Sequence, residues 1–479
     1  MSHFYSFYSL IGVINKTGRK NAVRLSKKSW EANMNIFKKS LIILIAAIMC
    51  LLGSTGCSAG PGGMDYDWYP SSKGETTDGK TDTDASRDDR PDKNGYDGMT
   101  ACAWDDNENY SYWLQMFEKT YVPDYPEGQD PNGDLSDGST ETSEEQQQSV
   151  TGKLYKYKKS WGLDSENRVT VTVKDGTTPI SGACVICYNG NNEAVYAAKT
   201  NANGVAYLFP SDNSGKVEVA NENGVLSKEF DETDREITFT ELSGFEQKSN
   251  LIEIMLVVDV TGSMGDEIRF LKNQLESVID RVSVFDNETT IKLAMLFYRD
   301  SCDRNEFTYY DFEDVTRVLG MRKQLNALSQ QYADGGGDYP ESVDKALEIA
   351  ANKQWSSSNS TKLIFHVLDA PPHNGQQYQT VFKNAVYKAA EKGIRICPIL
   401  ASGADMLTEY LTRQEAILTG GTFVFVTDDS GNGNAHYDPK LPVMTVERLD
   451  SLMVRLIRGY HTGTFEKPVF WLEDTAATK

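Results

Sequence analysis

Two carboxylates and two hydroxyls stand where they could together hold a divalent cation. Asp259 opens the sequence DVTGSM, Thr261 and Ser263 follow at alternating positions, and Asp369 ends the apolar run IFHVLD. The glycine between the hydroxyls permits a tight turn, so these oxygens could converge on one point. Hard oxygen donors suit Mg²⁺ best here, with Ca²⁺ or Mn²⁺ as alternatives, and they do not favour zinc. The other interpretation is a Ser/Thr turn that only caps the following helix.

No catalytic pattern accompanies these residues. Ser263 lacks the flanking glycines of a nucleophile elbow, and no histidine lies near it in the sequence. The chain has no HExxH, no glycine-rich phosphate loop and no GxSxG, and its five histidines are dispersed. Because a catalytic metal usually works with a general base, the sequence favours a binding protein over an enzyme.

The surrounding sequence predicts the elements that would position these residues. The run LIEIMLVVD over residues 251–259 is apolar almost throughout, as in a strand buried on both faces of a parallel sheet. Apolar strands then alternate with helical segments, which predicts an α/β doubly wound domain over residues 250–460. In such sheets ligands bind beyond the carboxyl ends of the strands, and Asp259 and Asp369 are expected at two of those ends.

Residues 250–460 resemble von Willebrand factor A domains. The resemblance lies in the D-x-[ST]-x-S pattern that starts at Asp259, in ADGGGDYPESVDKAL, and in LDAPPH, which contains Asp369. It implies a metal-ion-dependent adhesion site with one position left for a carboxylate of an outside ligand. Adhesive members supply a threonine from the middle loop, whereas this chain offers Asp338, with Ser342 nearby.

Asp338 changes the charge expected of that site. Three carboxylates around a divalent ion leave a net negative charge, which attracts an acidic ligand less than a neutral site would. Three alternatives follow: the ligand is not acidic, Asp338 acts through water, or the metal is mainly structural. His373, which follows two prolines in LDAPPH, is a candidate ligand contact or an ordinary loop residue.

Residues 1–57 are expected to be a signal peptide. Two lysines precede an apolar run over residues 41–53, which is too short to span the ~30 Å core of a bilayer and suits a secretory signal. The run leads into GSTGC, which resembles a bacterial lipobox with Ser54 in place of the usual leucine and implies lipidation of Cys57. Ordinary secretion with cleavage near Ala59 is the alternative, and Met34 is a candidate initiator.

A second domain is predicted over residues 161–247. Short alternating runs such as RVTVTVKD and GVAYLFP, separated by glycine-containing turns, are typical of an antiparallel β-sandwich. Their order resembles transthyretin-like or carboxypeptidase-regulatory-like sandwiches, which implies a spacer or binding module without catalytic residues. Cys184 and Cys187 form CxxC, but residues three apart on a strand face opposite sides, so core positions are expected rather than a metal or redox pair.

The remaining segments read as linkers and surface pieces. Residues 58–95 and 123–160 are predicted disordered or acidic linkers, because they bury too little apolar surface to offset the entropy of ordering. Between them, residues 96–122 are predicted to be an aromatic-rich helical segment that docks on a later domain or serves as a carbohydrate or partner platform. Residues 427–436 match half of a calcium loop and are expected to be a glycine-rich surface loop, and residues 461–479 a tail.

Composition and charge narrow the function. The net charge of −21 opposes binding to a phosphate backbone, so nucleic acid is not an expected partner. The sequence predicts a lipid-anchored protein of the bacterial cell surface that binds a protein, matrix or cell-surface ligand through its metal site. The alternative is a cell-envelope scaffold in which the metal is structural or engages an internal ligand.

Overall fold

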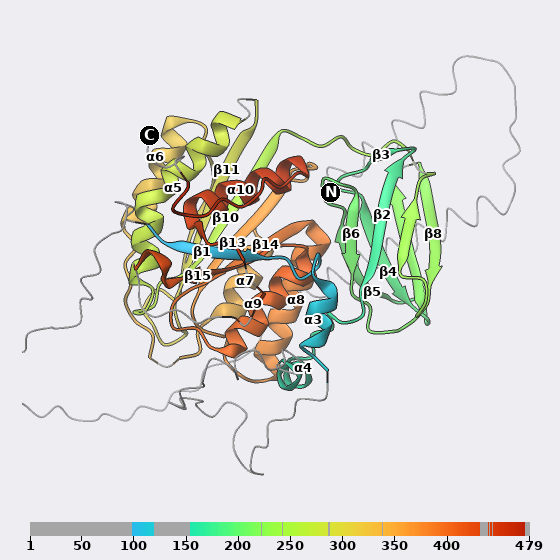
Figure 1. Ribbon diagram of the computed structural model, residues 1–479, viewed down its shortest axis with the longest axis horizontal. Helices are drawn as coiled ribbons and strands as arrows, with labels where there is room; N and C mark the ends of the chain where they lie inside the picture. The colour runs from blue at the N-terminus through green and yellow to red at the C-terminus, as the bar shows by residue number, and fades with distance from the viewer. Residues whose placement is uncertain are drawn as a thin grey trace, which may run out of the picture. The chain divides into compact units, whose positions relative to one another are not determined.

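The computed structural model describes residues 98–118, 154–221, 223–241, 243–285, 288–337, 339–431, 439, 441–442 and 444–474. These residues form a mixed α/β fold with one eight-stranded sheet and two four-stranded sheets (Figure 1). No helix within these ranges is long and apolar enough to cross a membrane. The signal peptide, Cys57, the first linker and Asp338 lie outside the described residues.

The eight-stranded sheet holds the strand ends on which the candidate site depends. Its order is β12-β11-β10-β13-β14-β15-β1-β16. Strands β10, β11, β13, β14 and β15 run parallel, whereas β12 and β1 pair antiparallel with their neighbours. The bounds are β1 (Thr100–Trp104), β10 (Leu251–Asp259), β11 (Thr290–Tyr298), β12 (Phe307–Asp314), β13 (Thr361–Leu368), β14 (Ile394–Leu400), β15 (Phe423–Thr427) and β16 (Glu447–Arg448).

Helices pack against both faces of this sheet, and strand β10 shows why. Met255 and Val257 belong to a buried cluster that includes residues of α7, α8 and α9. Leu256 and Val258 belong to a second cluster with residues of α5, α6 and α10. Because successive side chains of a strand point to opposite faces, an unbroken apolar run is what this strand requires. The helices are α5 (Gly265–Phe285), α6 (Val318–Ser329), α7 (Val343–Asn352), α8 (Gln376–Lys392), α9 (Met406–Thr419) and α10 (Leu449–Thr462).

The prediction of a helical segment over residues 96–122 was wrong for its first half. Residues Thr100–Trp104 form strand β1, which lies antiparallel between β15 and β16. Among the described residues of this segment, 98–118, helix is confined to Tyr110–Gln115, as α3. The five residues of β1 form a strand because their backbone groups complete the ladders of two distant strands, and a short local pattern does not reveal such partners. Trp113 and Phe117 pack in the cluster that contains α9, so these aromatics dock as expected.

Residues 154–241 contain the two smaller sheets. One has the order β3-β2-β6, with β9 parallel to β2, and the other has the order β5-β4-β7-β8. The strand β8 was not foreseen, because most of its side chains are exposed at the edge of its sheet. The bounds are α4 (Tyr155–Trp161), β2 (Val169–Asp175), β3 (Thr178–Pro179), β4 (Cys184–Asn189), β5 (Ala194–Lys199), β6 (Val205–Leu208), β7 (Gly215–Asn221), β8 (Gly224–Phe230) and β9 (Glu236–Phe239).

Strand β4 tests the prediction for the two cysteines. Cys187 is buried, Cys184 is half-buried, and both are free thiols. Burial alternates along β4, so the two side chains point to opposite sides as expected. Burial raises the pKa of the Cys187 thiol to about 12. A thiol that stays protonated is a poor nucleophile and a poor metal ligand.

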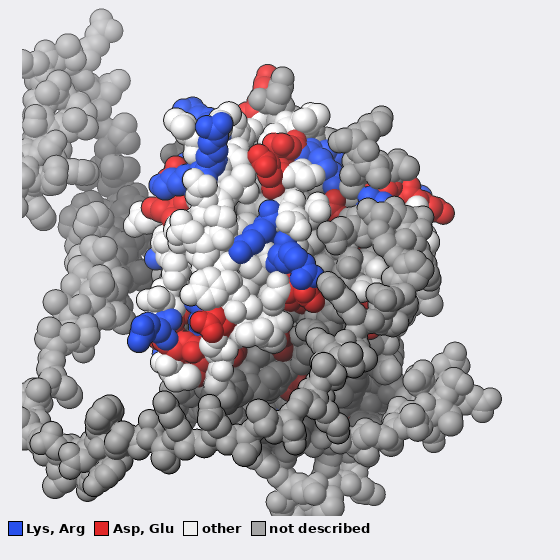
Figure 2. Space-filling model, turned by 90° about the vertical axis from the view of Figure 1, so that its left-hand side faces the viewer, with Lys and Arg blue, Asp and Glu red and all other residues white. Residues whose placement is uncertain are grey.

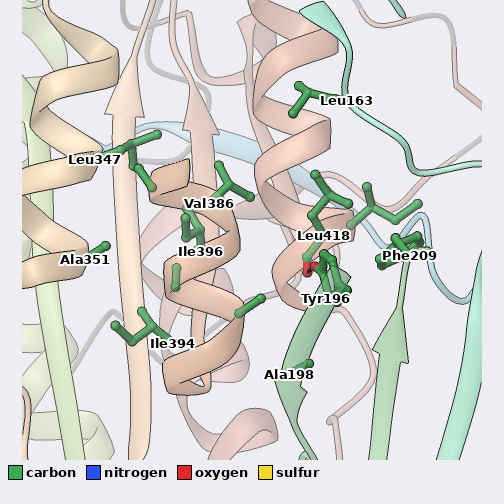
Figure 3. Close-up of a cluster of buried hydrophobic side chains, with 14 of the residues drawn as sticks. Leu163, Tyr196, Ala198, Phe209, Leu347, Ala351, Val386, Ile394, Ile396 and Leu418 are labelled. Atoms are coloured by element: carbon green, nitrogen blue, oxygen red, sulfur yellow. Dashed lines mark hydrogen bonds between the residues drawn. The ribbon is translucent and has the colours of Figure 1, made fainter. Parts of the chain in front are cut away.

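Strand β5 joins the small sheets to the α/β part. Tyr196 and Ala198 share a buried cluster with Val386 of α8 and Leu418 of α9 (Figure 3). The hydroxyl of Tyr196 donates a hydrogen bond to the Leu418 carbonyl. One continuous apolar core therefore joins the two small sheets to the eight-stranded sheet and its helices.

Candidate metal centre

The loop after β10 brings Asp259 and Thr261 into contact. Oδ1 of Asp259 accepts hydrogen bonds from the backbone nitrogen of Thr261 at 2.9 Å and from its Oγ1 at 2.7 Å. Both residues are buried. The other carboxylate oxygen of Asp259, Oδ2, is buried and has no hydrogen-bond partner. An unpartnered buried carboxylate oxygen is costly unless a proton or a cation compensates it.

The neighbouring parallel strand β13 supplies the second carboxylate. Asp369 follows its last residue, and the side chain of Ser263 hydrogen-bonds to it. Asp369 is buried and Ser263 is exposed, so this pair reaches from the interior to solvent. The four residues expected to share an ion therefore come together at one rim of the sheet.

The two aspartates oppose each other's ionisation. Burial, reinforced by the charge of Asp369, raises the pKa of Asp259 to about 7. Burial likewise raises the pKa of Asp369 to about 6, and the nearby Glu267 adds to this effect. Two carboxylates that resist ionisation side by side form a site that a positive charge would stabilise.

Glu341 is a third acidic group at this rim, and the sequence did not single it out. Only 3% of its surface is exposed, and its Oε2 has no hydrogen-bond partner. Burial, followed by the charges of Asp259, Asp300, Asp303 and Asp369, raises the pKa of Glu341 to about 9. In the metal-free chain this raised pKa favours the protonated carboxyl at neutral pH.

A glycine makes the close approach of Glu341 possible. A Cβ atom on Gly336, whose φ is +76°, would lie 3.1 Å from Oε1 of Glu341 and 3.2 Å from Cβ of Thr261. A side chain at this position would be strained and crowded. Asp338, the residue expected to join the site from this loop, lies outside the described residues. Ser342 donates to Oε1 of Glu306 at 2.8 Å and is thus engaged elsewhere.

The loop after β11 forms the next side of the rim. Oδ2 of Asp303 accepts a hydrogen bond from the Gly336 nitrogen at 2.8 Å, which ties this loop to the glycine-rich one. Nε2 of His373 lies 2.5 Å from Oδ1 of Asp300. Burial opposes ionisation of Asp300, but hydrogen bonds from His373, from the backbone of Ser301 and from Cys302 outweigh it and lower its pKa. His373 thus contacts a carboxylate at the rim, and contact with an outside ligand stays a prediction.

The donor set fits a hard divalent cation only if hydroxyls take part. Among the residues described by the structure, no three His, Cys, Asp or Glu side chains converge so as to hold an ion by themselves. The two aspartates would therefore need the oxygens of Thr261 and Ser263 beside them. Carboxylate, hydroxyl and water oxygens are the ligands that Mg²⁺ and Ca²⁺ prefer, and the unpartnered Oδ2 of Asp259 gives the ion a place to bind.

The floor of the site rests on a buried polar chain. Tyr298 pairs in register with Asp259, and its hydroxyl lies 3.1 Å from Nε2 of His366. Nδ1 of His366 lies 2.8 Å from Oε2 of Glu415 on α9. All three residues are fully buried. Because buried polar groups are costly to leave unpaired, this chain fixes strands β11 and β13 relative to α9.

The pKa values of the two aspartates predict a pH-dependent affinity for metal. The unfolded chain releases these protons near pH 4, whereas the folded, metal-free protein keeps them until about pH 6 and 7. Because the folded state holds these protons more tightly than the unfolded chain, they stabilise the fold fully below pH 4, and this stabilisation is lost as the pH rises through 6 to 7. A cation displaces these protons, so Mn²⁺ should bind about 100-fold more weakly at pH 5.5 than at pH 7.5.

Calorimetric titration with Mn²⁺ at both pH values checks this expectation. Proton release on binding, seen as a dependence of the heat on the buffer, should accompany it near pH 6.5. An affinity that is the same at both pH values would mean that the ion does not replace these protons.

Comparisons with known proteins match parts of the chain. Residues 253–425 match the family model described as the von Willebrand factor A domain. The alpha-protein kinase vwkA of Dictyostelium discoideum is 25% identical over 134 residues, which are 28% of this chain and 20% of that protein. The alignment therefore leaves most of the kinase unmatched.

Two solved structures show a more distant likeness. The pilus adhesin SpaC from Lactobacillus rhamnosus GG, in its open conformation, is 10% identical with a TM-score of 0.32, covering 58% of this chain and 36% of that one. The protein BatB from Bacteroides thetaiotaomicron is 14% identical with a TM-score of 0.28, covering 44% of this chain and 98% of that one.

Proposed function

We propose that the von Willebrand factor A domain of this chain, residues 253–425, binds one divalent cation at Asp259, Thr261, Ser263 and Asp369 and uses it to recruit a protein or matrix ligand. The strongest support for this proposal is the pair of buried aspartates. Asp259 has an unpartnered oxygen and a pKa raised to about 7, and the pKa of Asp369 is raised to about 6. The bound cation would supply an open coordination position for an oxygen of that ligand. Mg²⁺ is the ion we favour.

Glu341 bears on which ligand such a site would accept. In the metal-free chain the raised pKa of Glu341 favours its neutral form, in which this residue would add no negative charge beside the cation. A site with fewer negative charges repels an acidic ligand less. If Glu341 keeps its proton when the cation binds, the site would more readily accept a ligand that presents a carboxylate.

Replacing Glu341 with glutamine tests this assignment of charge. Glutamine matches the neutral acid in shape, so E341Q should bind Mg²⁺ within about threefold of the parent at pH 7.5. If Glu341 instead binds the metal as a carboxylate, the same change should weaken binding by about 10-fold or more. Calorimetric titration of both proteins with Mg²⁺ separates the two outcomes.

Two exposed tyrosines lie on the loops that surround the site. Tyr332 is 62% exposed, and its carbonyl is held by the guanidinium of Arg299. Tyr339 is 44% exposed, and its hydroxyl donates to the Asp369 carbonyl at 3.2 Å. Aromatic side chains that are exposed on fixed loops are common anchors of protein interfaces. Their positions support a macromolecular ligand at this rim.

The same proposal places the protein on the bacterial cell surface. Cleavage of residues 1–57 and lipidation of Cys57 would attach the chain to the membrane, and the following linker would hold the folded part away from it. The small sheets of residues 161–247 would act as a transthyretin-like spacer. Binding rather than catalysis is the proposed role of the metal.

Solid-phase binding tests the recruiting role. The purified chain is applied to a panel of immobilised extracellular-matrix and surface proteins with Mg²⁺, with EDTA, and with Mg²⁺ restored after EDTA. We expect at least one partner to be retained with Mg²⁺, lost with EDTA and recovered on restoration. Retention that is equal in all three conditions would refute the proposal. A metal that only stabilises the fold would raise the melting temperature without creating any metal-dependent partner.

A further inference from the structure

A basic pocket lies at the edge of the large sheet opposite the metal rim. Lys362 is at the start of β13 and Arg395 at the start of β14, whereas Asp369 follows the end of β13. Three further lysines line the same pocket: Lys199 at the end of β5, Lys248 ahead of β10, and Lys392 at the end of α8. The pocket therefore takes side chains from both the small sheets and the von Willebrand factor A domain.

Few acidic groups lie close enough to these five cations to neutralise them. Among the described residues, only Lys362 has a carboxylate partner within 4 Å, Oε2 of Glu253 at 3.9 Å. That oxygen also accepts hydrogen bonds from the hydroxyls of Ser356 and Ser360. The ammonium of Lys392 donates to the carbonyl of Ala351 at 2.6 Å, a neutral group. The pocket thus carries an excess of positive charge.

This excess is unusual for the chain. The protein has 69 acidic and 48 basic residues, so a pocket with five basic side chains does not reflect its composition. On the face of the molecule in Figure 2, by contrast, basic side chains lie close to acidic ones. Cations that outnumber the acidic groups around them repel one another and weaken the fold unless an anion joins them.

Two lysines of the pocket have lowered pKa values, chiefly because they are buried. Burial lowers the pKa of Lys362 to about 8; the charges of Glu253 and Glu246 oppose this shift, and those of Lys199 and Arg395 add to it. Burial and the charge of Arg395 lower the pKa of Lys248 to about 8. An anion bound among these lysines would raise their pKa values. The positions of the side chains and their charges therefore both favour an anion as the ligand of the pocket.

The neutral part of the lining is already ordered. Nδ2 of Asn359 donates to the Ser181 carbonyl at 2.9 Å, which links the two parts of the chain across the pocket. Nζ of Lys362 donates to the Ser358 carbonyl at 2.9 Å and to Oγ of Ser360 at 2.8 Å. A side chain on Gly182 would collide with Asn359, so the lining is closely packed there. Hydroxyl and amide groups beside the cations offer further hydrogen bonds to an oxyanion.

We propose that this pocket binds a phosphate or sulfate group, either as a free ion or carried on a larger molecule. A tetrahedral oxyanion with more than one charge matches several ammonium groups and the forked guanidinium of Arg395 better than a single carboxylate does. Because the lining comes from both parts of the chain, the bound anion also fastens the small sheets to the von Willebrand factor A domain. This site is separate from the metal rim and does not depend on it.

Calorimetric titration of the metal-free chain with inorganic phosphate at pH 7 and low ionic strength tests the proposal. We expect saturable binding at one site, competition by sulfate, and a melting temperature that rises with phosphate. The double variant K199Q/K248Q should bind phosphate at least 10-fold more weakly. The double variant K216Q/K228Q, on β7 and β8, makes the same change in charge away from the pocket and should bind like the parent.

Two results would overturn the proposal: no saturable phosphate or sulfate binding to the parent, or equal weakening in both double variants, which would indicate only a general effect of charge. A circular-dichroism spectrum and a phosphate-free melting temperature that match those of the parent show that K199Q/K248Q is folded. A sugar phosphate that binds more tightly than inorganic phosphate identifies a carried group as the ligand, and the reverse order identifies the free ion. Either order supports the site.

Discussion

Replacement of Asp259 with alanine is expected to weaken divalent-cation binding by about 100-fold or more. The change removes the oxygen that holds both the backbone and the hydroxyl of Thr261, and it removes the unpartnered Oδ2 as well. The metal-free variant should stay folded, because the lost carboxylate resists ionisation in the folded state at neutral pH. Calorimetric titration with Mg²⁺ at pH 8 measures the loss.

Asp280 offers a matched control for this experiment. It is exposed on α5, so Asp280→Ala removes one negative charge from the protein without touching the rim. The control should bind Mg²⁺ like the parent. Undiminished binding in Asp259→Ala, or an equal loss in both variants, would show that the ion does not bind where we propose.

Replacement of Arg413 with alanine should cause the largest loss of stability, about 3–5 kcal/mol. The guanidinium is fully buried. It donates hydrogen bonds to Asp106 from Nε at 2.9 Å and from Nη2 at 2.5 Å. Its Nη1 donates to Glu409 at 3.0 Å. Alanine would leave two carboxylates buried without their partner. It would also remove the ion pair that joins α9 to Asp106, between β1 and α3. Equilibrium unfolding in urea measures the difference.

An exposed ion pair shows how much of that loss depends on burial. Lys388 and Glu391 form a pair on α8 that is open to solvent. Lys388→Ala should therefore change the free energy of unfolding by no more than about 0.5 kcal/mol. If Arg413→Ala lowers the free energy of unfolding by less than about 1 kcal/mol, the buried ion pair between Arg413 and Asp106 does not stabilise the fold as we expect.

The α/β elements could be predicted because their patterns are local. The run over residues 251–259 is apolar almost throughout, and it forms β10 with those bounds. The end of the α/β part could be predicted less closely, because the last helix, α10, is followed by a loop whose path depends on its neighbours as well as on its sequence. Strand β1 could not be predicted, because its five residues become a strand only by pairing with residues more than 300 positions away.

The candidate site, too, could be predicted from the sequence only in part. Asp259 and Asp369 could be placed together because parallel strands end at a common edge. Glu341 could not, because its burial at the rim depends on the path of the glycine-rich loop and not on a local pattern. The signal was present in the three glycines that precede it, one of which leaves room for the Glu341 carboxyl. The basic pocket was hidden for a further reason: its cations are scattered from Lys199 to Arg395 in a chain with a net charge of −21.

The central claim is that Asp259 and Asp369 share a single cation. Crystals grown with Mn²⁺ and measured at a wavelength where manganese scatters anomalously would locate that ion directly. We expect one strong peak per chain at the rim, about 2.0–2.6 Å from its nearest oxygen ligands and bound to both aspartates directly or through one water. A peak that belongs to only one of these aspartates, or no peak at the rim, would contradict it.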